Sequence, residues 1–247
     1  MRWNDVVAGE VQPLAIGDVD GAIQILRTAP LRDLRSETFL REELLLTLGL
    51  NGEILHEFPS QLYPWCGHGV LSWQYPTQFA KYLTYLSGKD IRSYVEIGCR
   101  FGGTFIIVVE YLRRFSDLGL AAALDIDRAV IMDGYARRTV GIEYKIASSR
   151  DPEIVSWLGS RKWDLAFIDG DHTYEGCSSD FQAVRECATM IGLHDIASHA
   201  CPGVVRTWRE IRHIVPSNRI FEATDQYRDV RERTNMTFLG IGLVDFS

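Results

Sequence analysis

From residue 93 onward, short apolar runs alternate with longer amphipathic segments, and this alternation restricts the possible folds more than any other feature of the sequence. Apolar runs that end abruptly are typical of strands buried on both faces of a parallel sheet, with helices between them. We therefore expect an α/β fold with a doubly wound, seven-stranded sheet. No helix-length segment separates the last two strands, so we expect them to close the sheet as an antiparallel hairpin. The expected strands are residues 93–97, 121–126, 142–146, 165–168, 190–193, 219–222 and 238–244.

The first 73 residues have a different pattern. Apolar residues at helical spacing predict helices over residues 21–26 and 36–50, and another helix is expected over residues 76–88. Residues 51–73 are rich in proline, glycine and aromatic residues, and we expect a loop longer than a simple connector. We expect residues 1–73 to form a helical cap and aromatic lid. The stripe that needs a partner surface, and therefore predicts a homo-oligomer contact such as a dimer, is Leu40, Leu44, Leu45 and Leu48.

Charge and composition exclude several classes of protein. Twenty-six basic against 33 acidic side chains give a net charge of −7, which argues against a nucleic-acid partner. The apolar runs 118–124 and 238–244 are far shorter than the about 20 residues of a membrane-spanning helix. Residues 1–5 do not lead into a signal peptide, so we expect a cytoplasmic protein. The five cysteines contain no CxxC pair, which favours reduced thiols over disulfides or a zinc site.

The first expected strand runs into a glycine-containing loop. Glu96 and Gly98 are followed by Gly102, but Arg100 occupies the place where a dinucleotide fingerprint requires glycine. The loop therefore disfavours a dinucleotide. It suits a ligand with a small carboxylate for the helix N-terminus and an adenosine, a description that S-adenosylmethionine fits. The alternative is a glycine turn that only allows the helix to pack on the strand.

Polar residues also follow the second and third expected strands. Asp125 lies where a carboxylate accepts hydrogen bonds from a ribose in open α/β sheets. Asp125 or Asp127 could instead cap the next helix. Ser148 lies in a small polar segment suited to an adenine edge, although ordinary loop chemistry explains it equally well.

The fourth and fifth expected strands end in carboxylates and imidazoles. Asp169, Asp171 and His172 follow one strand, and His194 and Asp195 follow the next. Clustered carboxylates repel each other unless a cation or a shared proton compensates, so these residues predict a metal site or an acid/base site. The alternatives are that Asp171 caps a helix and that His194 is a hydrogen-bonded core residue.

Together these motifs resemble the class I S-adenosylmethionine-dependent methyltransferases over residues 74–247. They resemble in particular the bacterial metal-dependent sugar and small-molecule O-methyltransferases of the macrocin, mycinamicin and rhamnosyl type, and the cephalosporin-hydroxylase-like group. The resemblance implies a Rossmann-like sheet with an antiparallel last strand, and a methyltransferase domain over residues 74–247. The segments that carry the finer assignment are residues 73–76, 167–174, 194–196 and 201–204.

The resemblance also implies roles for single residues. Glu96, Gly98 and Gly102 would contact the methionine and ribose, and Asp125 the ribose hydroxyls. Asp169, which also lies at the cofactor, would be the first ligand of a divalent metal, with Asp195 as another. His194 stands where these enzymes usually have an acid, and magnesium prefers oxygen ligands. If His194 binds the metal, its nitrogen would favour manganese, iron or another transition ion. Alternatively, His194 does not bind the metal itself and contacts one of the metal ligands.

We therefore expect an S-adenosylmethionine-dependent O-methyltransferase that acts on a hydroxyl of a sugar, an oligosaccharide or a glycosylated small molecule. A divalent metal, magnesium or manganese, would bind the acceptor. His172 is the first choice for the general base because its unperturbed pKa is about 6.5, and Asp171 is the second. The aromatic residues that would face the acceptor, or else pack the lid, are Tyr63, Trp65, Trp73 and Tyr75.

Two other classes of function remain open at this point. His172, His194 and one of the carboxylates could form the facial triad of a non-haem iron hydroxylase, although the loop from Glu96 to Gly102 argues against it. The same fold could also serve as a cofactor-binding module without catalytic activity.

Overall fold

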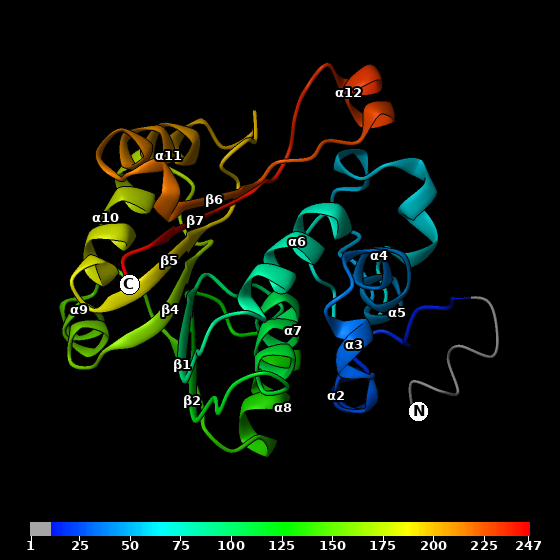
Figure 1. Ribbon diagram of the computed structural model, residues 1–247, viewed down its shortest axis with the longest axis horizontal. Helices are drawn as coiled ribbons and strands as arrows, with labels where there is room; N and C mark the ends of the chain where they lie inside the picture. Colours follow the sequence, from blue (N-terminus) through cyan, green and yellow to red (C-terminus); the bar gives the residue numbers. More distant parts are fainter. Residues whose placement is uncertain (1–10) are drawn as a thin grey trace.

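The computed structural model describes residues 11–247, in which one seven-stranded sheet carries helices on both faces (Figure 1). The prediction about a signal peptide at residues 1–5 lies outside the described residues. The strand order is β3-β2-β1-β4-β5-β7-β6, with β1 to β5 parallel and β7 antiparallel to both neighbours. This confirms the predicted doubly wound sheet with an antiparallel last strand. The strands are β1 Ser93–Ile97, β2 Leu120–Asp125, β3 Ile142–Ile146, β4 Trp163–Ile168, β5 Ala188–Leu193, β6 Ile220–Ala223 and β7 Ile241–Asp245.

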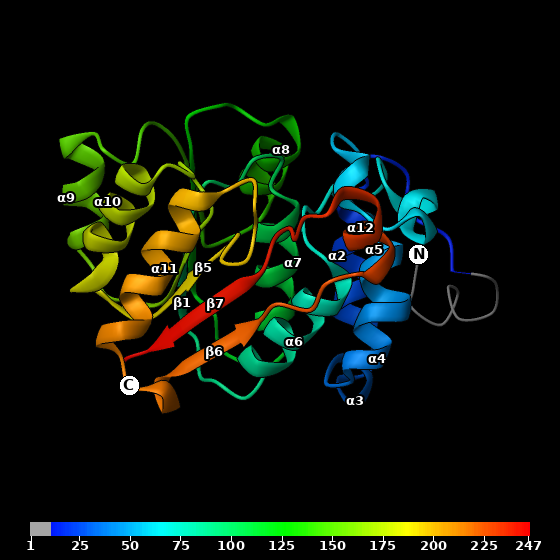
Figure 2. The same ribbon diagram turned by 90° about the horizontal axis from the view of Figure 1, so that it is seen from above.

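The connection between β6 and β7 differs from the predicted hairpin. The two strands pair, but the chain between them forms helix α12, Arg228–Thr234, which lies beside the N-terminal part of the protein (Figures 1 and 2). Arg233 donates hydrogen bonds to the Phe58 carbonyl and to the Tyr63 hydroxyl, both at 2.9 Å. Phe238 was expected in the last strand but is buried against this N-terminal part instead. The prediction was wrong because a seven-residue helix with Val230 as its only apolar residue leaves no hydrophobic periodicity in the sequence.

Two layers of helices cover the sheet (Figures 1 and 2). Alternate strand residues face opposite layers, so that Val95 packs with one layer and Tyr94 with the other. Helix α7 is apolar around almost its whole circumference, and all ten of its residues are buried. One layer consists of α9 Pro152–Gly159, α10 Tyr174–Arg185 and α11 Pro202–Ile214, and the other of α6 Pro76–Leu86, α7 Gly103–Leu112 and α8 Val130–Arg138.

The N-terminal extension adds a further layer outside α6 and α7 (Figure 1). The helix predicted over residues 36–50 is present, with a π-helical turn in its middle. Its leucine stripe, Leu40, Leu44, Leu45 and Leu48, is at most 2% exposed and packs in one core with α6 and α7. The stripe therefore finds its partner within the chain and does not require an oligomer contact. The elements of the extension are α2 Val19–Thr28, α3 Leu31–Leu34, α4 Glu37–Phe39, η1 Leu40–Leu44, α5 Leu45–Leu48, η2 Leu55–Glu57 and η3 Ser60–Trp65.

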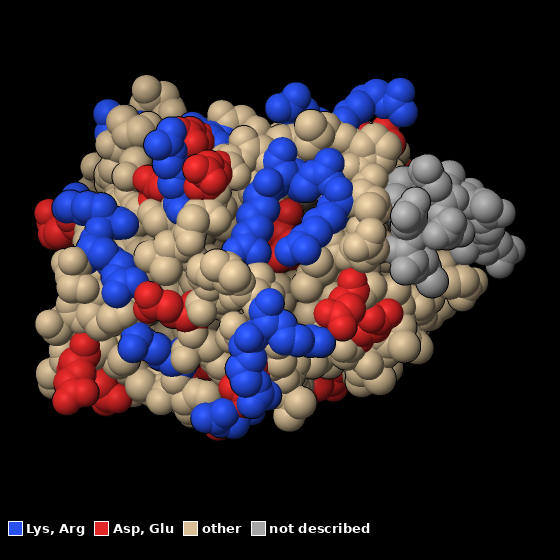
Figure 3. All heavy atoms as spheres, turned by 90° about the horizontal axis from the view of Figure 1, so that it is seen from below, with Lys and Arg blue, Asp and Glu red and all other residues tan. Residues whose placement is uncertain are grey.

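The surface and the helix lengths bear on possible partners. None of the helices within residues 11–247 combines the length and the apolar character needed to cross a membrane. On the face drawn in Figure 3, Lys and Arg side chains alternate with Asp and Glu side chains. Positive charges on this face therefore have negative neighbours, which agrees with the net charge of −7.

Candidate active site

A cavity of about 1150 Å³ opens at the carboxyl ends of the parallel strands, the edge at which ligands bind in open α/β sheets. The loops after β1 to β5 and the N-terminal extension form its walls. All the predicted site residues except Gly102 line this cavity: Glu96, Gly98, Asp125, Ser148, Asp169, Asp171, His172, His194 and Asp195. Gly102 is the N-cap of α7, with a φ of 91° that favours glycine.

The glycine loop brings two strand ends into close contact. Gly98 has a φ of 84°, and a Cβ atom built there would lie 2.2 Å from the carbonyl oxygen of Asp169. Only glycine therefore allows the loop after β1 to approach the loop after β4. Arg100 also has a positive φ, and its backbone N–H donates a 2.7 Å hydrogen bond to Asp125. The loop thus links the ends of β1, β2 and β4.

The carboxylates of the first two strand ends are held by local partners. Glu96 is 1% exposed and accepts a hydrogen bond from the Tyr94 hydroxyl, and burial raises the pKa of Glu96 well above its usual value. Asp125 accepts hydrogen bonds from the backbone N–H groups of Arg100, at 2.7 Å, and Asp127, at 3.0 Å. Ser148 accepts a 3.2 Å hydrogen bond from the backbone N–H of Arg150, within the loop after β3. These three polar residues line the same end of the cavity.

At the other end, the strand-end residues after β4 and β5 contact one another. The Oδ1 atom of Asp169 lies 3.0 Å from Nδ1 of His194 and 3.3 Å from Nε2 of His172. The other ring nitrogen of His172 lies 3.6 Å from Oδ2 of Asp195 and 3.3 Å from Sγ of Cys201. The sequence therefore placed these four acids and histidines correctly at one edge of the sheet. Cys201 lies within residues 201–204, one of the segments that carry the resemblance, but the sequence pattern predicts no role for it.

Charge coupling within this cluster shifts the ionisation of its members. Burial disfavours the charged form of Asp169, but the neighbouring His194 charge and hydrogen bonds from both histidines outweigh it and lower the pKa of Asp169. Burial likewise opposes the charge on His172, but hydrogen bonds with Asp169 and Cys201 and the nearby carboxylates raise its pKa to about 11. His172 therefore carries a positive charge at neutral pH in this arrangement.

Two buried atoms of the cluster have no hydrogen-bond partner. They are Nε2 of His194 and Oδ1 of Asp195, in residues that are 3% and 4% exposed. Unpaired buried polar atoms are costly, so a bound ligand or ion is a physical reason to keep them. Within residues 11–247, two groups of possible metal ligands converge: Asp169, His194 and Asp195, and His172, Asp195 and Cys201. Neither group contains both histidines, as the facial triad of an iron hydroxylase requires.

Asp171 lines the cavity but has its partners outside the cluster. It forms an ion pair with Arg150 and accepts a 2.9 Å hydrogen bond from the backbone N–H of Thr173. A Cβ atom on Gly176 would lie 2.3 Å from Cγ of Asp171, so this side chain packs on the first turn of α10. The N-cap of α10 is Thr173, whose hydroxyl accepts a hydrogen bond from the backbone N–H of Gly176, so Asp171 does not take the capping position that was its structural alternative.

The extension supplies a wall of the cavity, although not with all four predicted aromatic residues. Trp73 lines the cavity, whereas Tyr75 is fully buried, and Tyr63 and Trp65 pack against another apolar cluster. Glu57 also lines the cavity and accepts a 3.2 Å hydrogen bond from the indole N–H of Trp73. Burial raises the pKa of Glu57, and the charge of Asp195 adds to that shift. Sequence patterns gave no signal for Glu57, because it is a single acid in an irregular segment.

Comparisons with known proteins give a family match and distant structural likenesses. A search of curated proteins found no match. An O-methyltransferase from Bacillus cereus, solved with S-adenosylhomocysteine, is 16% identical, with a TM-score of 0.47 and coverage of 68% of this chain and 80% of its own. The TDP-rhamnose 3′-O-methyltransferase of calicheamicin biosynthesis is 14% identical, with a TM-score of 0.46 and coverage of 78% and 82%. At these identities and TM-scores, neither likeness contributes to the assignment.

The family match covers the central part of the chain. Residues 95–196, less than half of the chain, match the sequence model of a methyltransferase domain. This segment extends from β1 to the residues that follow β5, and it contains the glycine loop, Asp125 and both histidine-bearing strand ends. The match confirms the resemblance that the motifs predicted, over the part of the chain that carries most of them.

Proposed function

We propose that this protein transfers a methyl group from S-adenosylmethionine to a hydroxyl of a sugar, an oligosaccharide or a glycosylated small molecule, with the help of a divalent metal. The observation that carries the proposal is the shared cavity. Its Glu96 and Asp125 end suits the methyl donor, and its Asp169 and His172 end suits the activation of a hydroxyl. Methyl transfer requires both ends to face the same reacting atoms.

The donor end suits S-adenosylmethionine for chemical reasons. The N-terminus of α7 offers backbone N–H groups to a carboxylate, as in the methionine part of the cofactor. Asp125 is already oriented by two backbone hydrogen bonds and faces the cavity, where it can accept hydrogen bonds from ribose hydroxyls. Ser148 lines the side where the adenine would lie.

The acceptor end provides candidates for orientation and proton removal. In the transfer, a bond forms between the acceptor oxygen and the methyl carbon while the bond from that carbon to the sulfonium sulfur breaks. The sulfur leaves as the thioether of S-adenosylhomocysteine, and the hydroxyl proton must go to a base. Orienting the reactants in line supplies several kcal/mol, up to about 7–11 in the best intramolecular cases. His172 is our candidate base, in the state in which a bound cation balances the carboxylates and returns its pKa towards the usual value. The Asp171 carboxylate is the second choice because Arg150 already pairs with it. A base typically contributes about 10²- to 10⁴-fold.

The residues of the cluster fit a divalent cation. Asp169, His194 and Asp195 present donor atoms that converge, and two buried atoms of His194 and Asp195 lack partners. When bound, the cation would polarise the acceptor hydroxyl and replace the positive charge that His172 now supplies to the carboxylates. Since one donor is a nitrogen, manganese or another transition ion suits this group better than magnesium.

The acceptor would lie against the wall from the extension. Trp73 offers a flat apolar face suited to a sugar ring, and the carboxylate of Glu57 beside it can accept hydrogen bonds from hydroxyl groups. In this view residues 1–73 act as a lid that completes the site of the domain at residues 74–247. Because all five cysteines are free thiols, a reducing compartment such as the cytoplasm suits the protein.

Ligand-induced stabilisation tests the donor assignment. S-adenosylhomocysteine at about 100 times its dissociation constant should add about 2.7 kcal/mol to the free energy of unfolding and raise the melting temperature. NAD at the same concentration serves as the control and should cause no shift. A shift with NAD and none with S-adenosylhomocysteine would overturn the assignment.

Transfer of a labelled methyl group tests the reaction itself. The protein, labelled S-adenosylmethionine and a panel of sugars, nucleotide sugars and glycosides should yield an O-methylated product. Exhaustive chelation should abolish the transfer, and divalent ions should restore it. Binding of the cofactor without turnover on any acceptor would favour the module without catalytic activity, and full turnover after chelation would contradict the role of the metal.

A further inference from the structure

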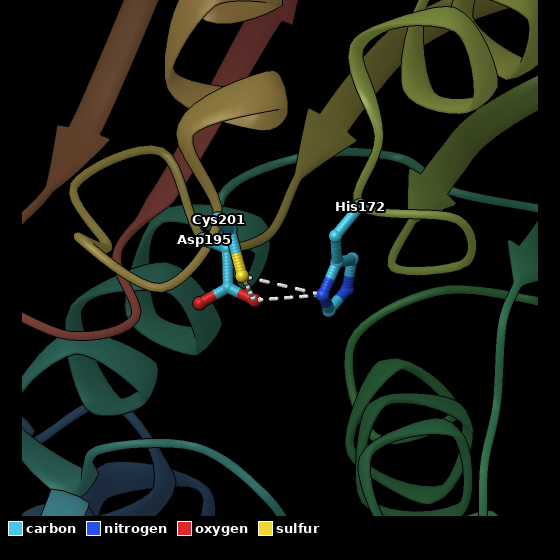
Figure 4. Close-up of side chains that lie close together, drawn as sticks. All are labelled: His172, Asp195 and Cys201. Atoms are coloured by element: carbon cyan, nitrogen blue, oxygen red, sulfur yellow. Dashed lines mark hydrogen bonds and ion pairs between the residues drawn. The ribbon is translucent and has the colours of Figure 1, made fainter.

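Three side chains from separate elements meet at the acceptor end of the cavity (Figure 4). His172 comes from the loop after β4, Asp195 follows β5, and Cys201 is the N-cap of α11. The Sγ atom of Cys201 lies 3.3 Å from Nδ1 of His172 and 3.2 Å from Oδ2 of Asp195. The Nδ1 atom of His172 lies 3.6 Å from the same oxygen, which completes a triangle of nitrogen, oxygen and sulfur donors.

We propose that this triangle binds a thiophilic divalent ion such as Zn²⁺. Zinc bonds are about 2.0–2.2 Å long to nitrogen and oxygen and about 2.3 Å to sulfur. In a tetrahedral site, two ligands of one ion therefore lie about 3.3–3.7 Å apart. The three distances in the triangle are close to this range, so the donor atoms already form one face of such a site. Magnesium, which prefers an all-oxygen shell, suits this donor set poorly.

The surroundings of the triangle support an ion there. Asp195 is 4% exposed, and its second oxygen has no hydrogen-bond partner. The other ring nitrogen of His172, Nε2, lies 3.3 Å from Asp169. A carboxylate on the far nitrogen of a ligating histidine is a common way to orient the ring at a metal site. Three protein ligands leave a fourth position, and because all three ligands line the cavity, a small molecule in the cavity could supply it.

This inference rests on the proposed function in one respect, because His172 and Asp195 belong to both sites. A thiophilic ion in the triangle takes the lone pair of His172 that the base would need. We therefore expect Zn²⁺ to inhibit methyl transfer that another divalent ion supports. The ligands of such a site come from three separate segments, so no short motif such as a CxxC pair indicates the site in the sequence.

Cobalt binding tests the triangle without any assay of methyl transfer. Co²⁺ titrated into the wild-type protein should produce a near-ultraviolet thiolate-to-cobalt charge-transfer band and visible bands of tetrahedral intensity. Zn²⁺ should displace the cobalt and remove the bands, whereas an equal concentration of Mg²⁺ should not. If the wild-type protein shows no charge-transfer band, a hydrogen-bonded cluster without a metal is the correct description and the proposal is overturned.

Two cysteine variants identify the sulfur ligand. Cys201→Ser should lose the charge-transfer band and bind Co²⁺ at least about 10-fold more weakly, as expected for a disturbed metal site. Cys187→Ser is the matched control, because Cys187 is also buried but bonds only to backbone carbonyls of α10. Melting curves of both variants show whether they fold. A band that survives in Cys201→Ser and disappears in Cys187→Ser would overturn the proposal.

The outcomes for the metal and for the reaction are separable. A protein that shows the cobalt band but methylates no acceptor keeps the triangle and contradicts the proposed function. A protein that methylates an acceptor with a divalent ion but shows no cobalt band keeps the function and contradicts the triangle. Relief of Zn²⁺ inhibition in Cys201→Ser would connect the two.

Discussion

Asp125 at the donor end of the cavity is held differently from Asp169 and Asp195 at the acceptor end. At the donor end, Asp125 is oriented by backbone N–H groups of its own and the neighbouring loop. At the acceptor end, Asp169 and Asp195 are oriented by His172, His194 and Cys201, which are side chains that titrate or bind metals. Backbone partners keep their hydrogen bonds when a neighbour is substituted, whereas side-chain partners depend on one another's charge. Substitutions at the two ends should therefore have different consequences.

The largest effect is expected for Asp169→Asn at the acceptor end. The carboxylate contacts both histidines, so its loss should disturb the base and the proposed metal together and reduce kcat by about 10²-fold or more. The affinity for S-adenosylhomocysteine, measured by calorimetry, should change much less. Asp133→Asn, which alters an ion pair with Arg128 away from the cavity, is the control. Equal losses of kcat and cofactor affinity would show that the two ends are not separable.

The complementary substitution at the donor end is Asp125→Ala. It removes a charged hydrogen-bond acceptor for the ribose, an interaction worth about 1.5–3 kcal/mol, so cofactor affinity should fall by about 10- to 100-fold. Turnover at saturating cofactor should stay within a few-fold of the wild type. The measurement is a cofactor titration of initial rates. A large fall in kcat at saturation would mean that Asp125 acts on the reacting atoms.

A smaller effect is expected for Glu57→Gln in the extension. The amide keeps the size of the side chain and the acceptor for Trp73 but removes the charge that faces the acceptor end. The loss of about 0.5–1.5 kcal/mol should raise KM for the acceptor by about 2- to 12-fold and leave cofactor affinity unchanged. Initial rates with varied acceptor test this. Unchanged KM would confine Glu57 to packing against Trp73.

The smallest effect is expected outside both ends, at the ion pair between Lys89 and Asp245. Burial opposes the charge on Asp245, but hydrogen bonds from Lys89 and Ser247 and the lysine charge together outweigh it and lower the pKa of Asp245 to about 2. Its stabilising contribution is therefore present above the unfolded pKa of about 3.9 and is lost as the pH falls towards 2. Lys89→Met should reduce the free energy of unfolding at pH 7 by about 1 kcal/mol or less. Urea unfolding at pH 7 and pH 3 checks this, and a constant difference would contradict the electrostatic cause.

How much could be read from the sequence differs between the fold and the site. Hydrophobic periodicity predicts the seven strands and which of them run parallel or antiparallel. It also predicts that Asp169 and His194 lie close together, because parallel strands end at the same edge of the sheet. The helix α12 and the position of Phe238 did not follow, since both depend on contacts with the extension, far away in the chain. The oligomer contact inferred from the leucine stripe lost its basis for the same reason.

The sequence by itself determined that the polar groups at the strand ends lie at the cavity, and the tertiary structure decided which of them meet and what else lines it. The sequence shows a glycine at position 98 and so predicts a tight turn there. Only the fold shows that the missing side chain leaves room for the carbonyl of Asp169. The pairing of Asp171 with Arg150, the contact of Cys201 with His172 and the placement of Glu57 on the cavity wall all join residues from separate elements. Such contacts leave no local pattern, because periodicity and spacing record the neighbours of a residue along one element, not across the sheet edge.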